Sequence, residues 1–357
     1  MMNASAQKAN AETSRSDEVT VALRRLRAYL ALPGEPDERL NPQWLASLFG
    51  VDVRVLLGAL AHAVRDGLVE LHWEVYCPLC GLRPDEFSSL REARGEIECV
   101  GCEVSFELHL DRDVRVTFSA TEAVRNVKGE SAPIPFADDS VAPVSGLELL
   151  LVPEFMELFG GDAPAPDESL SIGHVAILFT DLRGSTALYA ERGDPHAYRL
   201  VRDHFVILEA AIKAWRGTLI KTIGDAVMAS FASGADAVSA AFAAQAEIAA
   251  RARRETGANL VLKAGVHAGA CLAVRLNERL DFFGGAVNTA ARVQGLSQGA
   301  DVVVTDEVFL EIKNALADAA TPFRVAESFD APLRGLPAPV KVHRLTATSA
   351  GAAALLN

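Results

Sequence analysis

The C-terminal half of the chain alternates strand-like and helix-like segments from about residue 174 to residue 345. Its first segment is an apolar, β-branched run that ends at Asp181 and leads into a glycine-containing turn with a Ser-Thr pair. Alternation of this kind is typical of domains in which helices cover a sheet. The sequence therefore predicts an α/β (α+β) domain over residues 173–346.

The rest of the chain predicts further regions around this domain. The chain has 357 residues, half of them apolar, which is enough for two domains that each bury a core. We expect a disordered leader because the first residues are small and polar, and a connector because a later stretch is proline-rich and acidic with one short amphipathic helix. The expected regions are a leader at 1–18, an N-terminal regulatory or interaction domain at 19–119, the connector at 120–172 and a tail at 347–357.

Helix start and stop signals follow one another in the N-terminal domain. Asn41 and Pro42 form a cap and first-turn pair, Gly50 ends that short helix, and Asp52 can cap the next one. A strand-like run over 68–76 follows. Two helices that meet at a short turn before a strand resemble a winged helix-turn-helix.

Four of the five cysteines form two close pairs. Cys77 and Cys80 are separated by 18 residues from Cys99 and Cys102. Four thiolates at this spacing can close a tetrahedral Zn²⁺ site and leave no open position, which predicts a structural zinc ribbon. Redox-active or incidental cysteines are the alternatives.

The charge and hydropathy of the chain restrict its partners and location. A formal net charge of −13 gives no general attraction for nucleic acid or an anionic membrane. No apolar run approaches the roughly 20 residues that cross a bilayer, and the first residues lack the apolar centre of a signal peptide. We therefore expect a cytoplasmic protein with neither a nucleic acid nor a membrane partner.

A second segment of the C-terminal half, residues 217–231, consists of two apolar strands around Gly224 and Asp225. Glycine at the first turn position suits a two-residue hairpin, with Asp225 at its tip. If this hairpin lies beside the first strand, Asp181 and Asp225 converge and repel each other unless cations lie between them. Two Mg²⁺ or Mn²⁺ ions would satisfy that arrangement. Taken alone, an aspartate at a strand end is more often a turn or cap residue.

The third segment, residues 280–297, combines a glycine pair with a helix. Asn288 and Arg292 lie four residues apart on one face of that helix. By itself, this pair indicates no more than a solvated helix surface.

Together the three segments resemble the catalytic domain of class III adenylate and guanylate cyclases, over about residues 174–345. The resemblance implies a ferredoxin-like fold and a head-to-tail homodimer in which each active site takes residues from both subunits. The roles that it implies are metal binding by Asp181, Asp225 and the carbonyl of Leu182; base recognition by Lys221 and Asp281; transition-state stabilisation by Asn288 and Arg292; and, by a loose correspondence, phosphate binding by Arg334.

The base-recognition pair favours adenine over guanine. Asp281 can accept a hydrogen bond from the N6 amino group of adenine, and Lys221 can donate one to N1, whereas guanine presents the reverse pattern. The expected activity is conversion of ATP to 3′,5′-cyclic AMP in intracellular signalling, with a protein or small-molecule regulator acting at the N-terminal domain. The alternatives are a cyclase for GTP or another nucleotide, a nucleotide sensor without turnover, and a transcription regulator.

Overall fold

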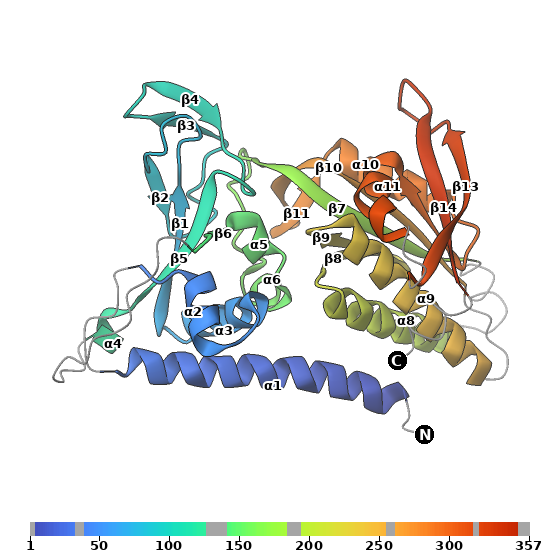
Figure 1. Cartoon of the computed structure of the whole chain (residues 1–357), viewed down its shortest axis with the longest axis horizontal. Helices are drawn as coiled ribbons and strands as arrows, with labels where there is room; N and C mark the ends of the chain where they lie inside the picture. Colours follow the sequence, from blue (N-terminus) through green and yellow to red (C-terminus); the bar gives the residue numbers. More distant parts are fainter. Residues whose placement is uncertain are drawn as a thin grey trace. The chain divides into compact units, whose positions relative to one another are not determined.

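The chain folds into two compact units, each described here by itself (Figure 1). The structure is a computed structural model that describes residues 4–32, 39–125, 141–183, 194–254, 261–316 and 321–348. The first unit comprises residues 1–173 together with 272–281, and the second comprises 174–271 and 282–357. Strands β7 (Leu170–Arg183), β10 (Val261–Leu276) and β11 (Arg279–Phe283) each contribute residues to both units.

The first unit begins with three helices, α1 (Ala4–Leu30), α2 (Pro42–Phe49) and α3 (Val53–Arg65). The predicted caps of the short helices are confirmed. The Asn41 side chain accepts from the backbone N–H groups at 43 and 44, Gly50 ends α2 with a left-handed φ of 62°, and Asp52 caps α3. Helix α1 packs on α3 through a small apolar cluster centred on Ala22 and Ala59.

Helix α1 differs from the disordered leader predicted for residues 1–18. Its backbone is helical from Ala4, and no glycine or proline interrupts the sequence before Leu30. Arg15 pairs with Glu154 at 2.9 Å, which ties the middle of the helix to the rest of the first unit. The polar composition of this segment is therefore compatible with a helical backbone.

Two antiparallel sheets and three short helices complete the first unit. The four-stranded sheet has the order β2-β1-β5-β6, and β3 pairs with β4. The bounds are β1 Val69–Val75, β2 Asp85–Phe87, β3 Glu96–Cys99, β4 Val104–Glu107, β5 Val114–Ala120, α4 Glu122–Arg125, β6 Val144–Ser145, α5 Gly146–Leu150 and α6 Pro153–Phe159. The described part of the expected connector, 141–172, is thus packed into this unit, with Phe155 buried against Trp73. The winged-helix interpretation stays a prediction.

The second unit is built on a long mixed sheet. Its strand order is β13-β14-β12-β10-β7-β9-β8, with β11 paired to β10. Besides β7 and β10, the elements are α8 Asp194–Ala214, β8 Thr218–Ile223, β9 Ala226–Phe231, α9 Gly234–Arg254, β11 Arg279–Phe283, α10 Gly285–Gly295, β12 Asp301–Thr305, α11 Asp306–Leu316, β13 Phe323–Ala331 and β14 Val340–Ala347.

The first six elements of this unit form a ferredoxin-like fold. In chain order they are β7-α8-β8-β9-α9-β10, a βαββαβ unit, and their spatial order is β10-β7-β9-β8. Strand β9 is antiparallel to both β7 and β8. The predicted α/β class and ferredoxin-like fold are confirmed.

Helices cover both faces of this sheet (Figure 1). Val302 and Val304 of β12 belong to the core cluster that contains α8, α9 and α11 residues. Val303, which alternates with them, belongs instead to a cluster with Val293 of α10. Because successive strand residues point to opposite faces, α10 lies on the face opposite α8 and α9.

Among the described residues, no single helix is long and apolar enough to cross a bilayer. Taken together, α2 and α3 have sufficient length and apolar composition, but the chain bends by 110° between them.

Candidate active site

The ends of two neighbouring strands bring the predicted metal-binding aspartates together. Asp181 follows Thr180, which pairs with Val227 of β9, and Asp225 lies in the two-residue turn between β8 and β9. Gly224 precedes Asp225 with φ of 63°, a conformation that favours glycine. The predicted hairpin and the convergence of Asp181 with Asp225 are therefore present in the structure.

The negative charges of the two carboxylates repel each other. The pKa of Asp181 is raised, first by burial, then by the negative charge of Asp225, and further by a hydrogen bond with that side chain. The Lys263 charge and the Leu182 N–H act in the opposite direction. The Oδ2 atom of Asp225 is buried without a hydrogen-bond partner among the residues that the structure describes. Two converging carboxylates with an unsatisfied oxygen fit Mg²⁺ or Mn²⁺, which prefer oxygen ligands.

This repulsion predicts that Asp181→Asn stabilises the metal-free protein at neutral pH. A raised carboxyl pKa means that the native state binds the proton more tightly than the unfolded state, so the associated stabilisation exists at low pH and disappears as the pH rises through that pKa. We expect a higher Tm for Asp181→Asn in EDTA at pH 8 and a shrinking difference towards pH 4, measured by calorimetry. Asp330→Asn, at an exposed strand position, is the control. An unchanged or lower Tm for Asp181→Asn would contradict the repulsion.

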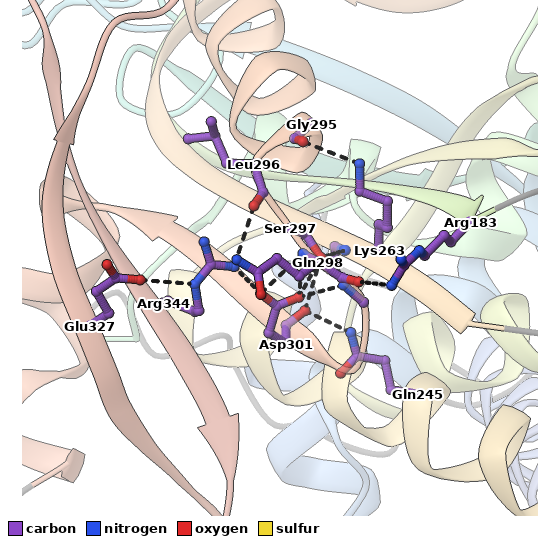
Figure 2. Close-up of polar contacts among 12 residues, drawn as sticks. Arg183, Gln245, Lys263, Gly295, Leu296, Ser297, Gln298, Asp301, Glu327 and Arg344 are labelled. Carbon is purple, nitrogen blue, oxygen red and sulfur yellow. Dashed lines mark hydrogen bonds and ion pairs between the residues drawn. The ribbon is translucent and has the colours of Figure 1, made fainter.

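A cleft lined by two cationic side chains also lies in the second unit (Figure 2). Arg183, Lys263, Ser297 and Gln298 line this cleft of ≈ 370 Å³. The positive charge of Lys263 acts to lower the pKa of Asp181. Arg183 lies on β7, two residues after Asp181. Sequence analysis did not identify Arg183 or Lys263. Lys263 could have been noticed in the sequence, because it is a charged residue within the otherwise apolar start of β10.

The turn after α10 forms one wall of the cleft and is held by a buried carboxylate (Figure 2). Asp301 is 4% exposed and accepts from the Ser297 hydroxyl at 2.6 Å and the Gly299 N–H at 2.9 Å. It also forms an ion pair with Arg344. Lys263 and Arg183 donate to carbonyls of the same turn, at Gly295 and Gln298, each at 3.1 Å. These contacts make the cleft wall a preformed structure.

Helix α10 presents the predicted transition-state pair. Asn288 is exposed and Arg292 half-buried, while Thr289 and Val293 face the core. A Cβ atom added at Gly335 would lie 3.3 Å from Nη2 of Arg292, so the turn that contains Arg334 packs against this guanidinium. In the described part of the chain, no hydrogen bond or ion pair joins either aspartate to Asn288 or Arg292.

The two residues predicted to recognise the base lie on different strands. Lys221 is half-buried on β8, opposite Met228, and Asp281 is 7% exposed on β11. These two residues fall in different compact units. The glycine-containing turn with its Ser-Thr pair, at 184–186, lies outside the described residues.

The four paired cysteines converge in the first unit. Their Sγ atoms all lie within 4.8 Å of one another, with 3.7 Å between Cys77 and Cys102 and 3.5 Å between Cys80 and Cys99. Ligand sulfurs at about 2.3 Å from a tetrahedral zinc ion are about 3.8 Å apart, so the spacing fits. Backbone N–H groups of Cys102 and Gly101 lower the pKa of Cys99 to about 7, whereas burial raises the pKa of Cys102 to about 12, so metal binding would have to displace the Cys102 proton.

Two protein families match this chain. The family described as Adenylate and Guanylate cyclase catalytic domain matches residues 168–346, half of the chain. A family of unknown function, DUF5939, matches residues 9–138.

Individual relatives match the same C-terminal half. The adenylate cyclase of Mycosarcoma maydis is 30% identical over 166 residues, which cover 41% of this chain and 6% of that protein. The adenylate cyclase of Anabaena cylindrica is 29% identical over 166 residues, which cover 41% of this chain and 33% of that protein. The chain thus spans less than a tenth of the fungal enzymes that it matches.

Among solved structures, the adenylyl cyclase CyaB from P. aeruginosa is 20% identical with a TM-score of 0.44, covering 51% of this chain and 97% of that one. An adenylate/guanylate cyclase/hydrolase from Silicibacter pomeroyi is 23% identical with a TM-score of 0.42, covering 51% of this chain and 100% of that one.

Proposed function

The chain belongs to the adenylate and guanylate cyclase catalytic-domain family, and on that basis we propose that it converts ATP to 3′,5′-cyclic AMP and pyrophosphate as a homodimer. The observation that carries this proposal is the convergence of Asp181 and Asp225 at the ends of paired strands, where the buried Oδ2 atom of Asp225 has no hydrogen-bond partner among the described residues. Bound between these carboxylates, two Mg²⁺ or Mn²⁺ ions would lower the pKa of the ribose 3′-hydroxyl and neutralise the leaving pyrophosphate.

Other side chains of the second unit would contact the triphosphate, the transferring phosphoryl group and the ribose. Lys263 and Arg183 provide positive charge beside Asp181, where the triphosphate of a bound nucleotide needs it. Arg292 stabilises charge on the transferring phosphoryl group, and Arg334 belongs to the turn whose Gly335 packs against the Arg292 guanidinium. Asn288 orients the ribose through a hydrogen bond.

This distribution of roles among the side chains fits a head-to-tail homodimer. Asn288 and Arg292 lie on one face of α10, and no polar contact in the described chain links them to the aspartates of their own subunit. In the proposed dimer each site combines the aspartates of one subunit with Asn288 and Arg292 of the other. The family's own arrangement implies the same sharing.

Product analysis tests the reaction. Purified protein is incubated separately with ATP, GTP, CTP and UTP in the presence of Mn²⁺ or Mg²⁺, and the products are identified by mass spectrometry. We expect 3′,5′-cyclic AMP and pyrophosphate from ATP. Cyclic GMP as the main product would replace the adenylate assignment with a guanylate one, and no cyclic product from any nucleotide would favour a silent nucleotide sensor.

Base recognition by Lys221 and Asp281 predicts a change in specificity. In Lys221→Glu/Asp281→Cys, the donor to N1 and the acceptor from N6 of adenine are both lost, so kcat/KM for ATP should fall by about 10²-fold relative to that for GTP. The ratio is measured by competition between the two nucleotides. Lys313→Ala, at a helix end in the unit that contains Lys221, removes one positive charge and so matches the net charge change of the double variant; it is the control. An unchanged ratio in the double variant would show that these residues do not read the base.

We further propose that the four converging cysteines hold one structural Zn²⁺. Four thiolates fill a tetrahedral shell and leave no position for water or substrate. The two-stranded ribbon β3-β4 is too small to be stabilised by an apolar core of its own, so a metal would provide the missing free energy.

Metal analysis of the full chain tests the zinc site. We expect about one zinc ion per chain, lost in Cys99→Ser and retained in Cys271→Ser, a buried cysteine outside the cluster. Zinc loss should increase hydrogen exchange at 77–102. Purified wild-type protein without zinc, or equal retention in both variants, would contradict the proposal.

A further inference from the structure

A buried histidine on α8 contacts the backbone of a metal-binding aspartate. His204 is 1% exposed and its Nε2 atom lies 3.1 Å from the carbonyl oxygen of Asp225. Its Nδ1 atom lies 2.6 Å from the carbonyl oxygen of Val201, one turn earlier on the same helix. The ring therefore spans from α8 to the tip of the β8–β9 hairpin.

The hairpin tip needs such support. Lys221, Thr222, Ile223 and Gly224 are half-buried or exposed, and Ile223 is 53% exposed. Gly224 contributes no side chain that could pack. The buried His204 imidazole lies within hydrogen-bond distance of the backbone of this turn.

Holding the carbonyl restricts the backbone from which the carboxylate projects. The Asp225 carbonyl and its side chain share one Cα atom, so a hydrogen bond to the carbonyl restricts the movement of the turn and of that Cα atom. Groups that orient metal ligands in this way strongly affect metal affinity, although they do not touch the metal.

We infer that His204 is a positioning residue, which holds the β8–β9 turn so that Asp225 meets Asp181 in a geometry suited to divalent cations. The inference deepens the proposed function, because it concerns the same pair of aspartates. A neutral imidazole carries one N–H group and can donate it to only one of the two carbonyl oxygens, so the inference requires the tautomer that donates from Nε2 to Asp225.

Three substitutions separate these two contacts. A glutamine amide nitrogen can occupy the place of Nε2, an asparagine amide nitrogen can occupy that of Nδ1, and leucine can replace neither. Binding of Mn²⁺ is measured without turnover, by electron paramagnetic resonance of free Mn²⁺ in the presence of 3′-deoxy-ATP, which cannot cyclise. We expect the Mn²⁺ dissociation constant to rise about 10-fold or more in His204→Leu and His204→Asn, and by less than about 3-fold in His204→Gln.

His343→Leu controls for the loss of a buried, hydrogen-bonded histidine. His343 is 2% exposed and bonds to Asp306 and Ser328, away from the aspartate pair. It should lower the Tm but leave the Mn²⁺ dissociation constant unchanged. Equal weakening in His343→Leu, equal binding in His204→Asn and His204→Gln, or wild-type binding in a folded His204→Leu would each overturn the inference.

The outcomes also separate this inference from the proposed function. Wild-type protein that binds Mn²⁺ through Asp225, tested with Asp225→Ala, but forms no cyclic nucleotide would refute the cyclase activity and leave the positioning role to be decided by the His204 series. Wild-type protein that binds no Mn²⁺ would overturn the positioning role itself. If His204→Leu fails to fold, the comparison of the glutamine and asparagine variants decides the matter.

Discussion

Asp181→Ala and Asp225→Ala should each reduce cyclic AMP formation by about 10³-fold or more, because each removes a ligand of ions that contribute several kcal/mol of transition-state charge stabilisation. The rates are measured at saturating ATP over a wide range of Mn²⁺ concentrations. Converging carboxylates with a raised Asp181 pKa are destabilising without a cation, so the loss should occur in well-folded protein.

Asp330→Ala removes an exposed carboxylate from β13 of the same unit and should retain wild-type activity. A folded Asp181→Ala or Asp225→Ala protein with near-normal turnover at all metal concentrations would refute metal binding by this pair. Recovery only at high Mn²⁺ would indicate weakened binding at the same site and would support the assignment.

The second large effect is expected from mixing inactive subunits. Arg292→Ala alone should lower turnover by about 10³-fold, because charge on the transferring phosphoryl group loses its stabilising cation. When Arg292→Ala and Asp181→Ala subunits exchange freely, half of the dimers are mixed, and each mixed dimer keeps one intact site out of two. Activity should therefore recover to about a quarter of the wild-type value at equal mixing.

Mixing Asp181→Ala with Asp225→Ala is the matched control, because both aspartates come from the same subunit and every site in the mixed dimer stays defective. Subunit exchange is verified with two differently tagged chains. Exchange without recovery in the Arg292 pair, or recovery in the aspartate pair, would contradict the shared site.

The sequence predicted those parts of the molecule whose signals are local. The caps Asn41, Gly50 and Asp52, the turn at Gly224 and Asp225, and the ferredoxin-like order all depend on patterns within a few residues or on the family resemblance. The convergence of Asp181 and Asp225 followed from one further assumption, that the hairpin lies beside the first strand.

The parts that were missed depend on contacts with no sequence signature. His204 contacts a backbone carbonyl, which any residue at position 225 would provide. Lys263 enters the cleft because β10 pairs in parallel with β12 and so brings the turn at 295–301 alongside it. The ion pair between Arg15 of α1 and Glu154 joins residues that are far apart in the sequence.

The assignment of residues 272–281 to the first unit has a consequence for exchanging parts between proteins. Within that unit, the Leu280 N–H donates to the carbonyl of Gly160 at 2.8 Å, and Arg279 donates to the carbonyl of Met156. A chimera that joins a foreign N-terminal segment at residue 173 would leave these donors without their native acceptors, one residue before Asp281. Transplanting the N-terminal half as an independent cassette therefore requires that the short stretch 272–281 be transplanted with it.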